Sequence, residues 1–186
     1  MKSPFEGQLV RLRAREVDDL DRYHRWLNDP EVTQHVMMRY PISVAFERNY
    51  LESVAPTSFE LALFSMDTLA GEHIGWCGLH GSSPEDRSAS LGIAIGEKSY
   101  WNGGYGTDAM RVLCRFGFEH MNLHRIELNV FDDNPRAQRV YEKIGFKVEG
   151  CRREADYRYG RHRDIVVMGL LRGELVEESR PSGAAS

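Results

Sequence analysis

The spacing of apolar and polar positions changes along the chain between the period of a strand and the period of a helix. In residues 125–131, Ile126, Leu128 and Val130 alternate with polar neighbours, which predicts a strand. In residues 17–27, apolar side chains recur every three or four positions, which predicts a helix. The same criteria predict strands at residues 9–13, 59–66, 71–79, 89–95, 125–131, 146–153 and 164–171, and helices at residues 17–27, 44–53, 107–120 and 135–144. Because strands outnumber helices and helices interrupt them, we expect a mixed sheet covered by helices in a three-layer α/β arrangement.

Cap and turn residues mark the ends of several elements. Asn134 is a favoured N-cap, Pro135 suits the first helical position, and Gly145 suits the C-cap of the same helix. Ser43 is the expected N-cap of helix 44–53, with Glu47 placed for a capping box. Turns are expected at residues 67–68, with slack in residues 69–70, and at 157–161. A loop is expected at 81–88, and one or two helical turns within 31–38.

The length and charge of the chain limit the classes of protein to consider. A chain of 186 residues with 41% hydrophobic content predicts one domain, placed at residues 1–173, followed by a disordered tail at 174–186. No apolar run approaches the roughly 20 residues that span a bilayer, and the N-terminal residues lack the apolar stretch of a signal peptide. We therefore expect a cytoplasmic protein without a membrane partner. The net charge of −4 argues against nucleic acid as a partner.

The three cysteines, Cys77, Cys114 and Cys151, are widely spaced and contain no C-x-x-C pair. This spacing predicts neither a disulfide framework nor a zinc site, so no metal is expected. Each cysteine is interpreted as a small, buried or half-buried residue.

A glycine-rich segment directly precedes a predicted helix. Residues 100–109 read YWNGGYGTDA. Such a loop leaves backbone N–H groups free to converge on an anion, and the helix dipole adds partial positive charge. The segment also matches G-x-G-x-x-A, a weak dinucleotide-binding signal, but its position in mid-chain argues against a Rossmann fold. A purely structural glycine turn is the alternative.

A second segment, residues 134–146, reads NPRAQRVYEKIGF. Asn134 and Tyr141 are two helical turns apart and therefore lie on roughly the same face of the predicted helix. Taken alone, Asn134 could be only a cap and Tyr141 only a half-buried aromatic residue.

Together, the two segments resemble motifs of the GNAT superfamily of acyl-CoA-dependent N-acyltransferases. The loop is similar to the pyrophosphate motif [QR]-x-x-G-x-[GA], and the second segment to N-x-x-S-x-x-x-Y-E-K-x-G-F. The resemblance covers residues 8–172 and is strongest to the RimJ/RimL-like group, which includes ribosomal-protein N-terminal acetyltransferases. Trp101 stands where the superfamily has Gln or Arg, and Ala137 replaces the common Ser.

The resemblance implies a GNAT fold and a reaction. The fold has a mostly antiparallel mixed sheet of about seven strands, splayed between the fourth and fifth strands. The reaction transfers an acetyl group from acetyl-CoA to a primary amine by direct attack in a ternary complex. The amine belongs to a small molecule or to a protein N-terminus, and a homodimer is left open.

The resemblance also implies roles for individual residues. The cofactor-binding residues would be Ile93, Ala94, Ile95, Trp101, Asn102, Gly103, Gly104, Tyr105, Gly106, Thr107, Asn134 and Tyr141. The backbone amides from Asn102 to Thr107 would bind the pyrophosphate, Asn134 the pantetheine, and Tyr141 would be the general acid.

The general base is less defined, because the strand at 89–95 carries no carboxylate. Asp156 is the first candidate and Glu154 the second, by similarity to some ribosomal-protein acetyltransferases. Pairing of both carboxylates with neighbouring arginines, or a water relay, is the alternative. Rival bases among the histidines are His73, His80, His120 and His124.

Two other classes of protein remain open at this point: a non-catalytic acyl-CoA-binding sensor with the same fold, and, more distantly, a dinucleotide-binding oxidoreductase. The motifs do not identify the amine.

Overall fold

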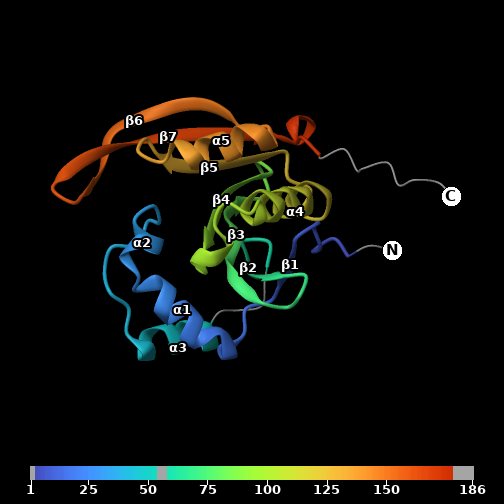
Figure 1. Ribbon diagram of the computed structural model, residues 1–186. Helices are drawn as coiled ribbons and strands as arrows, with labels where there is room; N and C mark the ends of the chain where they lie inside the picture. Colours follow the sequence, from blue (N-terminus) through green and yellow to red (C-terminus); the bar gives the residue numbers. More distant parts are fainter. Residues whose placement is uncertain (1–2, 54–57, 178–186) are drawn as a thin grey trace.

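The protein is described here by a computed structural model that covers residues 3–53 and 58–177. A single seven-stranded sheet runs through the molecule in the order β1-β2-β3-β4-β5-β7-β6 (Figure 1). The strands are β1 Val10–Arg13, β2 Leu61–Thr68, β3 His73–Ser83, β4 Ser88–Ile95, β5 Arg125–Phe131, β6 Lys147–Arg158 and β7 Arg161–Leu171. The helices are α1 Leu20–Leu27, α2 Pro30–Thr33, α3 Val44–Ser53, α4 Tyr105–Glu119 and α5 Pro135–Ile144, with 3₁₀ turns at Val17–Asp19, Lys98–Tyr100 and Arg172–Glu174.

The sheet separates between its fourth and fifth strands, as predicted. β4 and β5 are parallel and pair only where Ser88, Ala89 and Ser90 face Arg125, Ile126 and Glu127. Beyond this short ladder, β4 continues along β3 and β5 continues along β7. The facing edges of β4 and β5 therefore carry backbone N–H and C=O groups that do not pair with each other.

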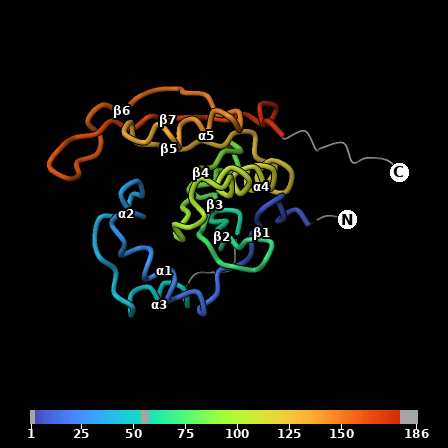
Figure 2. The backbone as a smooth tube through the Cα atoms, in the orientation of Figure 1, coloured from blue at the N-terminus to red at the C-terminus, as the bar shows by residue number. Residues whose placement is uncertain are grey.

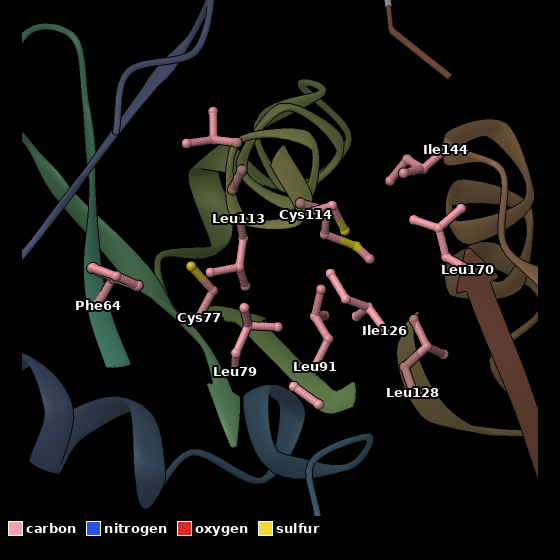
Figure 3. Close-up of a cluster of buried hydrophobic side chains, with 14 of the residues drawn as sticks. Phe64, Cys77, Leu79, Leu91, Leu113, Cys114, Ile126, Leu128, Ile144 and Leu170 are labelled. Carbon is pink, nitrogen blue, oxygen red and sulfur yellow. The ribbon is translucent and has the colours of Figure 1, made fainter. Parts of the chain in front are cut away.

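One face of the sheet packs against α4 and α5. Leu79, Leu113 and Ile126 lie at the centre of this core, and each side chain is fully buried (Figure 3). The alternation predicted for residues 125–131 is confirmed, because the apolar positions of β5 face this core. Each large aliphatic side chain that is buried contributes about 1.5–3 kcal/mol to the stability of the folded state. This face holds the two halves of the splayed sheet together.

The opposite face carries α1 and α2 and a smaller aromatic core. Tyr23 and Trp26 pack on Trp76 of β3. Beneath them, the carboxylate of Asp19 lies 3.1 Å from Nδ1 of His73 and accepts bonds from Arg13. The three-layer arrangement expected from the sequence is thus present.

The cysteines differ in exposure. Cys77 and Cys114 are buried free thiols, as predicted, and they lie next to the core residues in Figure 3. Cys151 is exposed, contrary to the prediction, because it lies on β6, the edge strand of the sheet, which pairs with β7 along one side.

Several connections differ from the predictions. The turn falls on the slack residues 69–70 rather than on 67–68, because Asp67 and Thr68 still belong to β2. Gly71, at φ +89°, supplies the left-handed conformation of the actual turn, and the Thr68 amide donates to the carbonyl of Glu72. The loop at 81–88 is shorter than expected, because β3 extends to Ser83 and β4 begins at Ser88.

The hairpin of β6 and β7 is longer than predicted. β6 continues to Arg158 through a register shift between Arg152 and Asp156, where Glu154 has φ +50°. A bulge of this kind interrupts the alternation that would have revealed the strand in the sequence. The hairpin extends past the rest of the sheet and its tip lies beside α2 (Figures 1 and 2).

The start of one helix and the capping box expected at another also differ. α4 begins at Tyr105 rather than at residue 107. α3 begins at Val44 as predicted, and Ser43 Oγ accepts a bond from the amide of Phe46, the third helical residue, as an N-cap should. Glu47 is one residue too late for the predicted capping box, and its side chain is buried instead.

The C-terminal boundary lies beyond residue 173. The amide of Val176 donates to the carbonyl of Ile144, Leu175 packs against the main core, and Glu177 pairs with Arg115. The first residues assigned to the tail are therefore attached to the domain. Residues 178–186, the rest of that assignment, lie outside the described part. No helix among the described residues is long and apolar enough to cross a membrane.

Candidate active site

A cleft of about 420 Å³ opens where the sheet separates. Four elements supply its walls: the end of β4, the start of α4, the first two turns of α5, and the α2 segment. Its lining residues are Glu31, Val32, Gln34, His35, Val36, Ile93, Ala94, Ile95, Trp101, Gly106, Met110, Asp133, Asn134, Pro135, Arg136, Ala137, Val140 and Tyr141. Seven residues predicted to bind the cofactor, including Asn134 and Tyr141, are therefore brought to one cleft.

The glycine loop ends in an uncapped helix N-terminus. Gly104 is the N-cap of α4, at φ +85°, and no side chain caps the helix. The first helical residues, Tyr105 to Thr107, have no intrahelical acceptor for their N–H groups. A Cβ at Gly103 would lie 2.8 Å from the ring of Tyr105, which would have to move to make room for it. Open amides at a positive helix end fit the pyrophosphate of a coenzyme A molecule.

Trp101 positions this loop. Its indole Nε1 donates to the carbonyl of Ile95 at 2.9 Å, and its ring packs against the aromatic core under α1. The side chain therefore attaches the glycine loop to the end of β4. Asn102 follows at φ +66° and turns the chain toward Gly104.

The edge of β4 forms one wall of the cleft. Ile93, Ala94 and Ile95 line it and are only partly buried. They pair with β3 on one side. Alternate residues of such a strand direct N–H and C=O groups toward the open side, which suits an extended, amide-containing ligand.

Asn134 joins two roles at the start of α5. Its Oδ1 accepts a bond from the amide of Ala137 at 3.1 Å, which confirms the predicted N-cap. Its side-chain NH₂ has no protein partner within residues 3–53 and 58–177, and Asn134 lines the cleft. The cap holds the side chain in place while leaving two N–H donors for a ligand.

Tyr141 lies two turns further along α5 and lines the same cleft. Its ring packs beside Phe146, with the centroids 6.1 Å apart, and the hydroxyl has no partner among the described residues. Burial raises the pKa of Tyr141 to about 12, because the phenolate would be poorly solvated. The hydroxyl therefore keeps its proton through the neutral and mildly alkaline range.

The two carboxylates considered as the base lie away from the lining of this cleft. Asp156 is only 2% exposed and accepts bonds from Arg163 Nη2 at 2.6 Å and from Arg39 Nη2 at 2.7 Å. Burial opposes ionisation, but these contacts and the nearby charges keep the pKa of Asp156 below its ordinary value. Glu154 is exposed on the bulge of β6. The environment of Asp156 is not that of a base poised near neutral pH.

The histidines considered as rival bases are also outside the lining. His73 is buried under α1, where its Nε2 lies 2.9 Å from the carbonyl of Gly75. His80, His120 and His124 are exposed, and His120 stacks on Phe116.

Sequence reasoning missed His35, Asp133 and Arg136, all of which line the cleft. Arg136 follows Pro135 in the first turn of α5, so the motif that contains Asn134 could have drawn attention to it. No local pattern marks His35, because its position depends on how α2 packs against the distant β6–β7 hairpin.

A second cavity, of about 460 Å³, lies between α2, the segment that follows it, and the tip of the hairpin. Its walls contain Tyr40, Tyr157 and Tyr159, together with Arg39 and Arg158. No aspartate or glutamate is among its lining residues in the described part of the chain. Since both cavities are lined by residues of α2, the helix separates them.

Comparisons with known proteins agree with this geometry. A family model described as an acetyltransferase (GNAT) domain matches residues 10–147. The chain therefore belongs to the GNAT acetyltransferase family. It is an acyl-CoA-dependent N-acetyltransferase, and the predicted fold and splayed sheet are confirmed.

Relatives and solved structures show how similar the chain is to particular members. It is 34% identical to a putative ribosomal N-acetyltransferase, YdaF, of Bacillus subtilis (strain 168), over 56% of both chains. It is 26% identical to a spermidine N(1)-acetyltransferase of Escherichia coli (strain K12), over 94% of this chain and 92% of that protein. The crystal structure of spermidine N-acetyltransferase from Vibrio cholerae in complex with CoA and spermine superimposes with a TM-score of 0.78 at 24% identity, covering 89% of this chain and 96% of that one.

Proposed function

We propose that the protein transfers an acetyl group from acetyl-CoA to a primary amine by direct attack in a ternary complex. One observation carries this proposal. The separation of β4 from β5 brings the open edge of β4, the uncapped start of α4, Asn134 and Tyr141 to a single cleft. A sensor that only bound an acyl-CoA would need the first three features but would have no use for a buried, protonated phenol.

Different groups of the protein would bind different parts of acetyl-CoA. When bound, acetyl-CoA supplies the thioester carbonyl carbon and a thiolate leaving group. The backbone amides from Asn102 to Thr107 would hold the pyrophosphate with the help of the α4 dipole. The free NH₂ of Asn134 would bind an amide of the pantetheine arm, which would lie along the edge of β4.

Tyr141 would protonate the departing sulfur. With a pKa of about 12, the phenol is a weak acid, so proton transfer requires a thiolate that is close and poorly solvated. The burial that raises the pKa also supplies this condition, because it removes water that would otherwise stabilise the thiolate. The hydroxyl has no other partner among the described residues, and so it is available to the sulfur.

The second cavity favours one class of acceptor. A polyamine carries several positive charges and is best held by carboxylates, whereas this cavity presents two arginines and three tyrosines. Both terminal nitrogens of Arg158 donate to backbone carbonyls, whereas the Arg39 side chain is 46% exposed. We therefore propose an acceptor whose amine is attached to a neutral or acidic molecule, of which a peptide or protein N-terminus is the leading example.

The resemblance to RimJ/RimL-like motifs and to the putative ribosomal N-acetyltransferase supports this choice of acceptor. The proposed acceptor differs from that of the spermidine N(1)-acetyltransferase relative. An α-amine also suits the chemistry. Its ordinary pKa of about 7.7–8.0 leaves part of it neutral at physiological pH, whereas an alkyl amine near 10.4 is almost fully protonated.

The test is a panel of acceptors assayed by thiol release from acetyl-CoA. It compares peptides with acidic or neutral residues after a free N-terminus, the same peptides with a blocked N-terminus, and spermidine. We expect the highest kcat/KM with the free N-termini and none with the blocked ones. A preference for spermidine would refute the acceptor class, but not the acetyltransferase.

Shifts in melting temperature distinguish the acetyltransferase from the two alternatives, a non-catalytic acyl-CoA sensor and a dinucleotide-binding oxidoreductase. CoA at about 100 times its dissociation constant should add roughly 2.7 kcal/mol of stability, and NADH should add none. A CoA shift without thiol release on any amine would indicate the sensor. A shift with NADH alone would indicate the oxidoreductase.

A further inference from the structure

The cleft contains five titratable side chains, and four of them have states or partners that exclude them as a base. Arg136 is cationic, and Tyr141 holds its proton. Asp133 is paired with Arg161 and Arg163, and Glu31 is paired with Lys98 at 2.6 Å. The remaining group is the imidazole of His35.

We propose that His35 is the general base that accepts a proton from the acceptor amine, with Asp133 orienting its ring. This inference rests on the proposed acetyl transfer and adds to it the residue that completes the proton balance. The predicted candidates on β6 would then have structural roles.

The geometry around the imidazole defines which nitrogen is free. Nδ1 of His35 lies 3.6 Å from Oδ1 of Asp133. Asp133 is itself held by Arg161 Nη2 at 2.7 Å. A proton on Nδ1 would face this carboxylate, which leaves the lone pair on Nε2. Asp133 is the one polar partner of the His35 ring among the described residues, so Nε2 remains available in the cleft.

The surrounding charges keep the ring neutral. Partial desolvation by the cleft walls lowers the pKa of His35 below its ordinary value of about 6.5, although 32% of the side chain stays exposed, and Arg163 and Arg158 act in the same direction. Asp133 opposes them, as an anion should. Glu31, from α2, lines the same cleft. At pH 7 the imidazole is therefore an unprotonated base.

The segment that carries His35 is held firmly. The guanidinium of Arg158, at the tip of the β6–β7 hairpin, donates to four backbone carbonyls between Thr33 and Met38, at 2.8–3.3 Å. Figure 1 shows α2 beside this tip. The hairpin thus fixes the base relative to the cleft, as a catalytic group requires.

The protons and bonds balance in this scheme. The amine nitrogen forms a bond to the thioester carbon, and its proton passes to Nε2 of His35. The carbon–sulfur bond breaks, and the sulfur receives the proton of Tyr141. His35 then loses its proton to solvent and Tyr141 regains one, so the products are the N-acetylated amine and free CoA. The nitrogen becomes acidic as its new bond forms, which is why a base with a pKa below 6.5 suffices.

The test combines turnover with a measurement that needs none. His35→Ala, with His80→Ala as a matched control on an exposed histidine, is assayed against pH with acetyl-CoA and the best acceptor of the panel. We expect His35→Ala to lower kcat by about 10²–10⁴-fold, to lose the break in the profile below pH 6.5, and to recover partly with added imidazole. CoA should still raise its melting temperature, and His80→Ala should match the wild type.

The independent measurement is the ¹⁵N NMR titration of the wild-type imidazole with CoA bound, assigned with His35→Gln. We expect a pKa below 6.5 and a proton on Nδ1 in the neutral form. A proton on Nε2 would overturn the proposal even if His35→Ala failed to fold. Wild-type kcat in His35→Ala, or a change in KM alone, would overturn it while leaving the acetyltransferase intact. A wild type without transfer to any amine would overturn both.

Discussion

Replacing Asp156 by asparagine is expected to destabilise the β6–β7 hairpin and to leave proton transfer largely intact. The carboxylate lies on β6 and accepts three hydrogen bonds, two from Arg163 of β7 and one from Arg39 of the segment after α2. The substitution keeps the size of the side chain but removes the charge that compensates Arg163, whose side chain is 2% exposed.

The size of the effect follows from the partners that remain. Removing one member of a buried ion pair costs about 3–5 kcal/mol. Arg163 still contacts Asp133 at 3.3 Å and stacks over the ring of Phe131 at 3.8 Å, and the asparagine oxygen can still accept a bond. We therefore expect the lower end, about 3 kcal/mol. In a protein of this size that corresponds to a fall in Tm of roughly 6–12 °C.

The measurements are thermal and urea unfolding together with a pH profile of kcat. The matched control is Glu154→Gln, the same change of carboxylate to amide two residues earlier on β6. Because Glu154 is exposed, the control should change the free energy of unfolding by less than about 0.5 kcal/mol.

One result would refute this reasoning. If Asp156→Asn kept the wild-type Tm, lost about 100-fold or more in kcat, and recovered activity as the pH rose, Asp156 would be the base. Its ion pairs would then have to open when substrate binds.

Three further predictions test other parts of the molecule. Tyr141→Phe should lower kcat about 10²–10⁴-fold and leave the CoA-induced melting shift unchanged, because only the hydroxyl is lost. Gly104→Val should abolish the CoA shift, since φ +85° strains a β-branched residue by a few kcal/mol and the loop must rearrange. Burial opposes ionisation of Asp19, but hydrogen bonds from Arg13 and the nearby imidazole of His73 hold its pKa well below the ordinary range. The stabilisation from Asp19 is therefore complete above the unfolded pKa of about 3.9 and declines as the pH falls below it, so Asp19→Asn should flatten the dependence of urea stability on pH between 5 and 2.

Each of these predictions has an opposite outcome that would contradict it. Full turnover in the phenylalanine variant would make Tyr141 a packing residue. An unchanged CoA shift in the valine variant would place the pyrophosphate elsewhere. An equally steep loss of stability in acid for Asp19→Asn would assign acid unfolding to other carboxylates.

The sequence predicted those parts of the site that are formed by residues close to one another along the chain. Asn134 and Tyr141 share a face because a helix repeats every 3.6 residues, and the glycine loop prepares the start of α4 because those residues are contiguous. The order of strands and helices, and the family to which the chain belongs, could be inferred for the same reason. The errors were local as well: a bulge at Glu154 hid the length of β6, and Gly71 placed a turn later than residues 67–68.

Only the tertiary structure decided which side chains meet in the cleft from distant segments. His35 follows α2 and Asp133 precedes α5, yet the two are 3.6 Å apart. Asp156, a plausible base in the sequence, is enclosed by Arg39 and Arg163. The spacing of residues along the chain does not predict such contacts, because each depends on where the β6–β7 hairpin packs against α2. That placement is determined by packing and ion pairs across the whole fold.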